Sequence, residues 1–142
     1  MAQPSPDSVD FRPDDYRWEH RLLFVFAPSG DADALREQTA AVADRAAGFR
    51  DRDLLLITAH AEGGGALRRA PGADPTPLTT AAVERLYDRF DVPPAAFRVV
   101  LVGKDGTEKR RNAAPVTAGS IFDTIDAMPM RQREMREDDG GS

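Results

Sequence analysis

The sequence predicts an α/β domain built on a central mixed four-stranded sheet with helices on both faces. Three short apolar runs, residues 21–27, 53–59 and 97–103, are nearly unbroken and bounded by turn residues, which is typical of strands buried on both faces. Segments with apolar residues at helical spacing lie between these runs. The 142 residues suffice for one domain with a full core.

The segment that follows the first strand is predicted to be a helix. Apolar residues recur at helical spacing over residues 35–49, and Gly48 lies near the expected end. We expect Asp31 or Asp33 to cap its N-terminus, because a carboxylate accepts hydrogen bonds from the free amides of the first turn. Residues 53–59 then form the second strand, and two parallel strands joined by a helix make a right-handed unit.

The second half of the chain predicts a loop, a helix, a hairpin and a closing helix. Residues 61–77 contain four Gly and three Pro, which indicates a long surface loop. The next helix is expected to begin after Thr79, its N-cap. Asp105-Gly106 favours a two-residue turn, so residues 107–111 should return as the fourth strand after 97–103. The last helix spans about residues 118–128 and ends before Pro129.

The order of elements also predicts the domain boundaries. A strand–helix–strand unit, then a helix, a hairpin and a helix, is the thioredoxin-like arrangement, in which residues 21–27 and 97–103 adjoin in the middle of the sheet. We expect this domain to span residues 16–130. Residues 1–15 are polar and Pro-rich and are expected to be a flexible tail. Residues 131–142 are expected to be a charged tail, partly helical and then disordered.

Composition excludes several classes of function. The chain has no cysteine, which excludes disulfides, thiolate metal sites and any thiol oxidoreductase or peroxidase activity on these residues. The formal net charge of −5 argues against nucleic acid as a partner, since phosphate binding requires a basic face. No apolar run approaches the roughly 20 residues of a membrane span. No cofactor is expected.

The candidate functional face is the turn after the first strand. In the thioredoxin-like arrangement this turn lies at a helix N-terminus, where redox proteins place a reactive thiol. Here it contributes Pro28, Ser29, Asp31 and Asp33, and His60 ends the neighbouring strand. We expect these residues to form the ligand or partner face of a non-catalytic module with a binding or structural role. The partner is an unknown protein or small ligand.

A cysteine-free enzyme is the alternative hypothesis. Ser29 with His60 as its base would make a hydrolase, and Asp31, Asp33 and His60 together would hold a metal ion. Against the first, the Gly-x-Ser-x-Gly pattern is absent. Against the second, aspartates at a helix start are common for capping alone. The sequence therefore favours a turn serine and an exposed histidine, with no catalytic or metal-binding residue assigned.

Three segments carry a resemblance to a known family: "RLLFVFAPS", "FRVVLVGKDGTEK" and "IDAMPMRQREM". They resemble the bacterial family called domain of unknown function 4174, and a related module occurs in animal sushi-repeat extracellular proteins. The likeness covers about residues 17–136 and is most specific at 126–131. Gln38 and Arg52-Asp53 also match.

The resemblance implies a thioredoxin- or peroxiredoxin-like fold and favours export, periplasmic or secreted, over the cytoplasm. The first ten residues lack the pattern of a signal peptide. The resemblance supplies no catalytic residues. When the peroxiredoxin pattern Pro-x-x-x-Thr-x-x-Cys is aligned from Pro28, its threonine falls on Ala32 and its cysteine on Leu35.

Overall fold

The structure is a computed structural model that describes residues 8–62 and 64–140. Its elements in chain order are the 3-10 helix Pro13–Tyr16, β1 (Arg21–Ala27), α1 (Asp33–Val42), α2 (Ala46–Asp51), β2 (Leu54–His60), β3 (Gly65–Arg68), β4 (Thr76–Pro77), α3 (Thr80–Phe90), β5 (Arg98–Val102), β6 (Glu108–Asn112), α4 (Ala118–Asp126) and α5 (Pro129–Gly140).

A single mixed sheet forms the middle layer, with strand order β4-β3-β2-β1-β5-β6. The central strand β1 pairs in parallel with β2 and antiparallel with β5. Phe24 in β1 lies opposite Ile57 of β2 on one side and Val100 of β5 on the other. The predicted mixed sheet, with residues 21–27 and 97–103 side by side, is confirmed.

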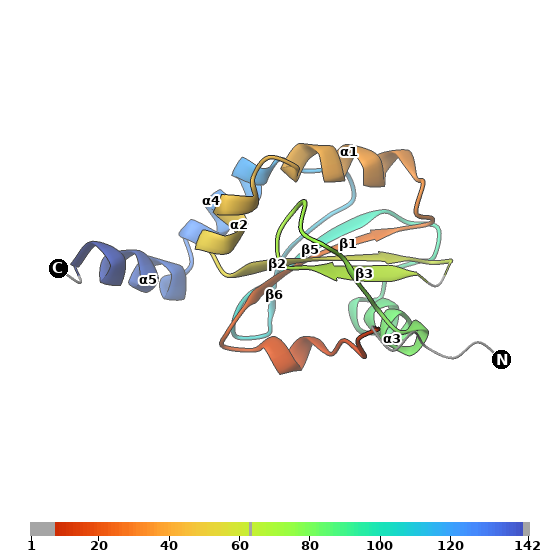
Figure 1. Cartoon of the computed structure of the whole chain (residues 1–142), viewed down its shortest axis with the longest axis horizontal. Helices are drawn as coiled ribbons and strands as arrows, with labels where there is room; N and C mark the ends of the chain where they lie inside the picture. Colours follow the sequence, from red (N-terminus) through yellow and green to blue (C-terminus); the bar gives the residue numbers. More distant parts are fainter. Residues whose placement is uncertain (1–7, 63, 141–142) are drawn as a thin grey trace.

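Two hydrophobic cores fill the spaces above and below the sheet. Figure 1 shows α1, α2 and α4 on one face, and α3 with the N-terminal 3-10 helix on the other. Every residue of β1 is buried, and successive side chains enter opposite cores, so Phe24 and Phe26 face α3 while Leu23 and Val25 face the other helices. The ring of Phe24 lies 4.9 Å from that of Phe90 in α3, measured between centroids.

The predicted loop over residues 61–77 is wrong, because two further strands form within it. β3 pairs antiparallel with β2, and β4 pairs antiparallel with β3, which gives six strands in place of four. Without β3, the backbone donors and acceptors along one side of β2 would be unpaired. The Gly and Pro content hid these strands, which are short.

The predicted single helix over residues 35–49 is also wrong, because it divides into α1 and α2. The break turns α2 against α4, where Phe49 packs edge-on to Phe122 with ring centroids 5.7 Å apart. Neither Asp31 nor Asp33 caps α1. The N-cap is Ala32, which makes no side-chain cap, and Asp33 is already the first helical residue.

Both predicted tails take part in the described fold. Phe11 is buried and stacks on Tyr16, and Val9 forms a parallel bridge to Leu78. The expected looseness of residues 1–15 is therefore wrong from Val9 onward, and residues 1–7 lie outside the described residues. At the other end, residues 131–140 belong to α5, whose buried Arg131 packs against the domain. The expected disordered end at Gly141 and Ser142 lies outside the described residues.

Other local predictions are confirmed. The Thr79 hydroxyl accepts a hydrogen bond from the amide of Ala82 and so caps α3. The hairpin between β5 and β6 also forms, but the predicted two-residue turn is wrong: Gly103 pairs with Thr107, so the turn contains three residues, 104–106, and Gly106 supplies its left-handed conformation with a φ of +83°. None of the helices in the described part of the chain has the length and apolar character needed to cross a membrane.

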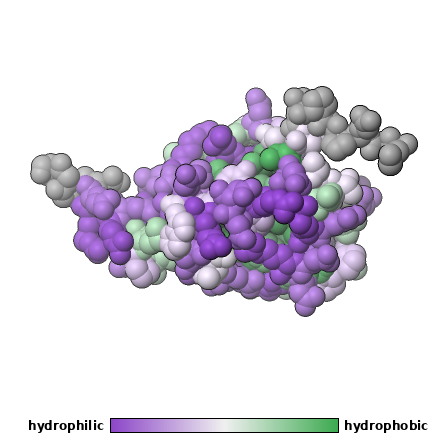
Figure 2. Space-filling model, turned by 90° about the horizontal axis from the view of Figure 1, so that it is seen from below, coloured by the Kyte–Doolittle hydropathy of each residue, from purple (hydrophilic) through white to green (hydrophobic). Residues whose placement is uncertain are grey.

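The surface seen from the α3 side is mostly hydrophilic, with apolar residues visible between polar ones (Figure 2). Across residues 8–62 and 64–140, Trp18 is the one large apolar side chain that is mostly exposed, at 62%. Isolated exposed apolar residues are normal on a protein surface. The part of the surface that this view shows is therefore mainly polar.

Candidate functional site

The turn between β1 and α1 lies at the carboxyl end of the central strand. Here the Ser29 hydroxyl donates a 2.6 Å hydrogen bond to Asp31. This bond, with a backbone hydrogen bond, holds the pKa of Asp31 below its ordinary value. Asp33 points elsewhere and forms a 3.7 Å ion pair with Arg36, in which both side chains are exposed. The turn's acidic side chains therefore have separate partners.

His60 lies beside this turn because β2 runs parallel to β1 and pairs it with Ala27. Its ring faces Gly30, where a methyl group in place of the glycine hydrogen would lie 3.6 Å from His60 Nε2. The Nδ1 atom is buried and has no hydrogen-bond partner in the described structure. Burial lowers the pKa of His60, although the nearby Glu62 opposes this, so the imidazole is neutral near pH 7.

Tyr87 fixes the ends of the two parallel strands from the opposite face. Its hydroxyl donates to the carbonyl of Ala27 at 3.0 Å and approaches that of Ala59 at 3.4 Å. Burial raises the pKa of Tyr87 to about 12, so the phenol stays protonated as a donor. The position of His60 relative to the turn is thus held by the strand pairing and by α3.

The arrangement gives no support to the enzyme hypotheses. Ser29 donates to Asp31, and over residues 8–62 and 64–140 no hydrogen bond joins Ser29 to His60. A serine nucleophile requires such a base within hydrogen-bond reach. No group of three His, Asp or Glu side chains in the described chain is placed to hold a metal ion. Among the residues of the predicted face, Ser29 is hydrogen-bonded to Asp31, and the ring of His60 lies against Gly30.

A groove of about 700 Å³ opens from this corner along α1 and over β2 and β3. The strand register explains it: Arg68 of β3 lies opposite Leu56, and Ala66 lies opposite Thr58, so all four side chains share one face. The lining is mainly apolar with a few polar groups: Leu35, Arg36, Thr39, Ala40, Ala43, Leu56, Thr58, His60, Ala66, Arg68 and Pro71, with three glycines.

The α1 wall of the groove is anchored by Gln38. Its side chain is buried, donates to the carbonyl of Val116 at 2.9 Å and accepts from the amide of the same residue at 2.7 Å. This double hydrogen bond ties α1 to the segment before α4. The sequence resemblance includes Gln38, and the structure gives it a positioning role for the helix.

Sequence reasoning missed most of the groove. Arg36, Thr39 and Ala40 share one side of α1, and Ala66 and Arg68 alternate along β3, but β3 was not predicted. The pattern Ala-Leu-Arg at 66–68 was the available signal, because alternation indicates a half-buried strand. It was outweighed by the surrounding glycines and prolines.

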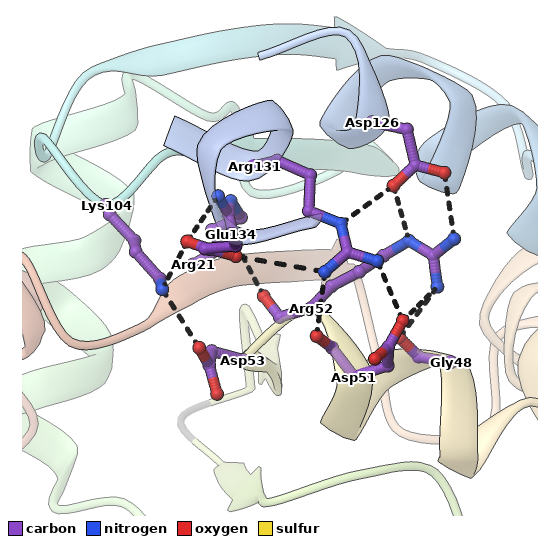
Figure 3. Close-up of polar contacts among 9 residues, drawn as sticks. All are labelled: Arg21, Gly48, Asp51, Arg52, Asp53, Lys104, Asp126, Arg131 and Glu134. Carbon is purple, nitrogen blue, oxygen red and sulfur yellow. Dashed lines mark hydrogen bonds and ion pairs between the residues drawn. The ribbon is translucent and has the colours of Figure 1, made fainter. Parts of the chain in front are cut away.

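A second polar feature, which we call the ionic cluster, lies at the opposite ends of the strands, where β1 and β2 begin (Figure 3). It consists of four cations and four carboxylates: Arg21, Arg52, Lys104, Arg131, Asp51, Asp53, Asp126 and Glu134.

Glu134 in α5 is one hub of the ionic cluster. It accepts hydrogen bonds from Arg21 at 3.1 and 3.2 Å and from Lys104 at 2.7 Å. Arg21 is only 1% exposed. Burial raises the pKa of Glu134, but the hydrogen bonds from Arg21 and Lys104 outweigh it, so this pKa lies below its ordinary value. Glu134 therefore stays charged and holds α5 against the sheet.

Asp126 at the end of α4 is the second hub. Arg52 binds both of its oxygens, at 3.1 and 2.9 Å, and Arg131 binds one at 3.0 Å. Burial raises the pKa of Asp126, but these two arginines hold it below the ordinary value. Arg131 also reaches Asp51 at 2.7 Å. The cluster contains equal numbers of cations and carboxylates, and each cation contacts at least one carboxylate. We therefore interpret the ionic cluster as a structural clamp.

Comparison with known protein families assigns the chain to one of them. A family model described as "Domain of unknown function (DUF4174)" matches residues 12–134. The chain belongs to this family. The range that matches this DUF4174 family model includes the clamp residues Arg52, Asp126 and Arg131.

Two curated proteins are similar in sequence. Coiled-coil domain-containing protein 80 of Danio rerio is 29% identical over 130 residues, which cover 84% of this chain and 15% of that protein. Sushi repeat-containing protein SRPX2 of Xenopus laevis is 26% identical over 124 residues, which cover 87% of this chain and 26% of that protein. The DUF4174 chain thus spans only about a quarter or less of these relatives.

Two of the similar solved structures are a thioredoxin peroxidase and a peroxiredoxin. Thioredoxin peroxidase I of Plasmodium yoelii has a TM-score of 0.61 at 14% identity, covering 84% of this chain and 79% of that one. The reduced 2-Cys peroxiredoxin of Plasmodium vivax has a TM-score of 0.61 at 12% identity, covering 84% and 71%. This likeness shows a thioredoxin-like fold. Because the DUF4174 chain has no cysteine, no thiol redox step can take place on it.

Proposed function

We propose that this DUF4174 chain is a binding module that uses the thioredoxin-like scaffold without thiol chemistry. The groove between α1 and β2–β3 is its binding site, and Gly30 of the turn after β1 lines one end of it together with His60 of β2. The observation that carries the proposal is the size and lining of the groove. Its volume of about 700 Å³ lies within the range of small-molecule sites.

The lining supports the same function. Small-molecule sites are mainly apolar, with a few polar groups that orient the ligand. Leu35, Leu56 and Pro71 supply apolar surface here, while Arg68 and His60 supply polar groups. The groove also opens at the carboxyl ends of β1 and β2, the edge at which open α/β sheets place their ligands.

Filling the groove is expected to weaken ligand binding. Ala40 lines it from α1, and Ala41 is the next residue of the same helix but lies outside the lining. We expect Ala40→Phe to weaken by at least about tenfold the affinity of small-molecule fragments selected on the parent protein, because the ring occupies their volume. Fragment affinities are measured by ligand-observed NMR on the folded variants.

Ala41→Phe is the matched control, since it adds the same ring to the same helix. Its fragment affinities should equal those of the parent protein. Equal weakening by both substitutions would show a general effect on α1. Undiminished binding to Ala40→Phe would place the ligands elsewhere and contradict the proposed function.

A further inference from the structure

The groove carries positive charge in a chain that is negative overall. The formal net charge of the chain is −5. The groove lining nevertheless contains two arginines, Arg36 and Arg68, and no Asp or Glu. At physiological salt, charges more than about 8 Å away are largely screened, so a small ligand responds to this local charge.

Neither guanidinium is strongly neutralised within the described structure. Arg68 is half-buried at the end of β3 and forms no ion pair with a described carboxylate. Arg36 has only the 3.7 Å contact with Asp33, and both of these side chains are exposed. Exposed ion pairs of this kind contribute little free energy, so an incoming anion competes with them easily.

Neutral hydrogen-bonding groups lie between the charges and the closed end. Thr58 is a buried polar residue of β2, and its hydroxyl makes no side-chain hydrogen bond to any residue that the structure describes. His60 has a buried Nδ1 atom without a partner in the described chain, and its lowered pKa keeps the ring uncharged. A ligand with oxygen atoms can therefore accept a hydrogen bond from the Thr58 hydroxyl, whereas the buried Nδ1 atom of His60 is out of its reach.

The strand pairing argues against an extended peptide as the ligand. Both edges of β3 are already occupied, by β2 on one side and β4 on the other. A peptide cannot add to this part of the sheet as a further strand. What remains for a ligand is the apolar surface of Leu35, Leu56 and Pro71 together with the guanidinium groups.

We propose that the groove binds a small organic anion, with a carboxylate or phosphate head at Arg68 and Arg36 and an apolar body against Leu35, Leu56 and Pro71. The inference rests on the proposed function and adds the chemical class of the ligand to it. Arginine binds both carboxylate and phosphate in a forked geometry. The test therefore compares one probe that carries a carboxylate with one that carries a phosphate.

Four linear probes of six carbon atoms each test the head group: hexanoate, hexyl phosphate, 1-hexanol and hexylammonium. We expect hexanoate, hexyl phosphate or both to bind at least about tenfold more tightly than the neutral and cationic probes. Binding should weaken as sodium chloride is raised. Affinities are measured by titration while the backbone amide resonances of Thr58, His60 and Ala66 are followed by NMR.

Two adjacent arginines provide a matched pair of variants. Arg68→Gln should weaken the anionic probes by about tenfold and leave 1-hexanol unchanged. Arg69→Gln is the control, because Arg69 is exposed, follows Arg68 directly and lies outside the groove lining. If Arg68→Gln fails to fold, Arg36→Gln on exposed helix surface gives the same comparison. Unchanged anion affinity in folded Arg68→Gln and Arg36→Gln overturns the inference.

The remaining outcomes separate this inference from the proposed function. If 1-hexanol or hexylammonium binds the groove as tightly as the anions, the anion inference is wrong and the binding function stands. The same holds if all four probes fail while uncharged members of the fragments selected for the Ala40→Phe experiment occupy the groove. If neither the probes nor any fragment binds there, both are wrong.

Discussion

Glu134→Gln is expected to lower the free energy of unfolding by about 3 kcal/mol. The substitution keeps the shape of the side chain but removes the carboxylate that Arg21 and Lys104 share. Both cations are buried, with Arg21 at 1% and Lys104 at 8% exposure. Removing one partner of a buried ion pair is strongly destabilising, because a buried charge then lacks compensation. Urea denaturation followed by circular dichroism measures the loss.

Glu137→Gln is the matched control for this prediction. Glu137 lies on the same helix, α5, and is exposed. Exposed substitutions of this kind change the free energy of unfolding by no more than about 0.5 kcal/mol. An equally small effect for Glu134→Gln would show that the ionic cluster does not clamp α5 to the sheet.

Acid is expected to destabilise the protein through carboxylates whose pKa is depressed by folding. Asp126 and Glu134 have ordinary values of 3.8 and 4.5, and the ionic cluster lowers both. Burial raises the pKa of Asp105, but hydrogen bonds from Lys109 and Thr107 outweigh it and lower the value to about 2. These groups bind protons more weakly in the folded state than in the unfolded state.

The sign of the effect follows from this difference. At a pH above the ordinary pKa values, the carboxylates are ionised in both the folded and the unfolded state, and the stabilisation is fully present. As the pH falls below those values toward the folded ones, the unfolded state takes up protons first, and stability is lost. Each extra proton bound by the unfolded state lowers the free energy of unfolding by about 1.4 kcal/mol per pH unit. His60, whose pKa burial lowers from 6.5, adds a loss that begins at higher pH.

Urea midpoints measured from about pH 7 to about pH 3 check this prediction. Most of the decrease in the free energy of unfolding of the parent protein should occur below about pH 5. The Glu134→Gln variant should lose less over the same interval, because its clamp retains Asp126 but no longer contains the titrating carboxylate of Glu134. A midpoint that stays constant down to the lowest pH, or an identical slope in the variant, would contradict the assignment.

The regular part of the fold could be predicted because local sequence signals and tertiary structure agree there. The apolar runs of β1, β2 and β5 have one stable location, the middle of the sheet. Thr79 caps α3 with its own side chain, and Gly106 supplies the positive φ of the hairpin turn. Each of these features depends on residues that are close together in the sequence.

The missed features depend on contacts between distant residues. β3 consists of four residues rich in small side chains, and its pairing with β2 stabilises it more than its own sequence does. Arg21 would be expected at a strand end in solvent, since arginine is rarely buried without a partner. Its partner Glu134 lies 113 residues away in the chain. No local pattern predicts such a pairing.

Part of the candidate face could be predicted from the sequence, because it depends on how two predicted strands pair. His60 and the turn could be placed together from the expected parallel pairing of two strands, which the register confirms. The assignment of Pro28, Ser29, Asp31 and Asp33 to a binding face stays a prediction. Arg68, which β3 brings to the groove, could not be included before β3 was known.

The central claim is that the groove on the α1 face binds a ligand on a scaffold that lacks thiol chemistry. The most direct measurement is the map of methyl resonances that shift when the selected fragments, hexanoate and hexyl phosphate are each added in turn to isotope-labelled protein. We predict shifts at Leu35, Leu56 and Thr58, which line the groove. Shifts confined to Leu55 and Leu67, which line a pocket of about 330 Å³ apart from the groove, or the absence of any shift, would contradict the claim.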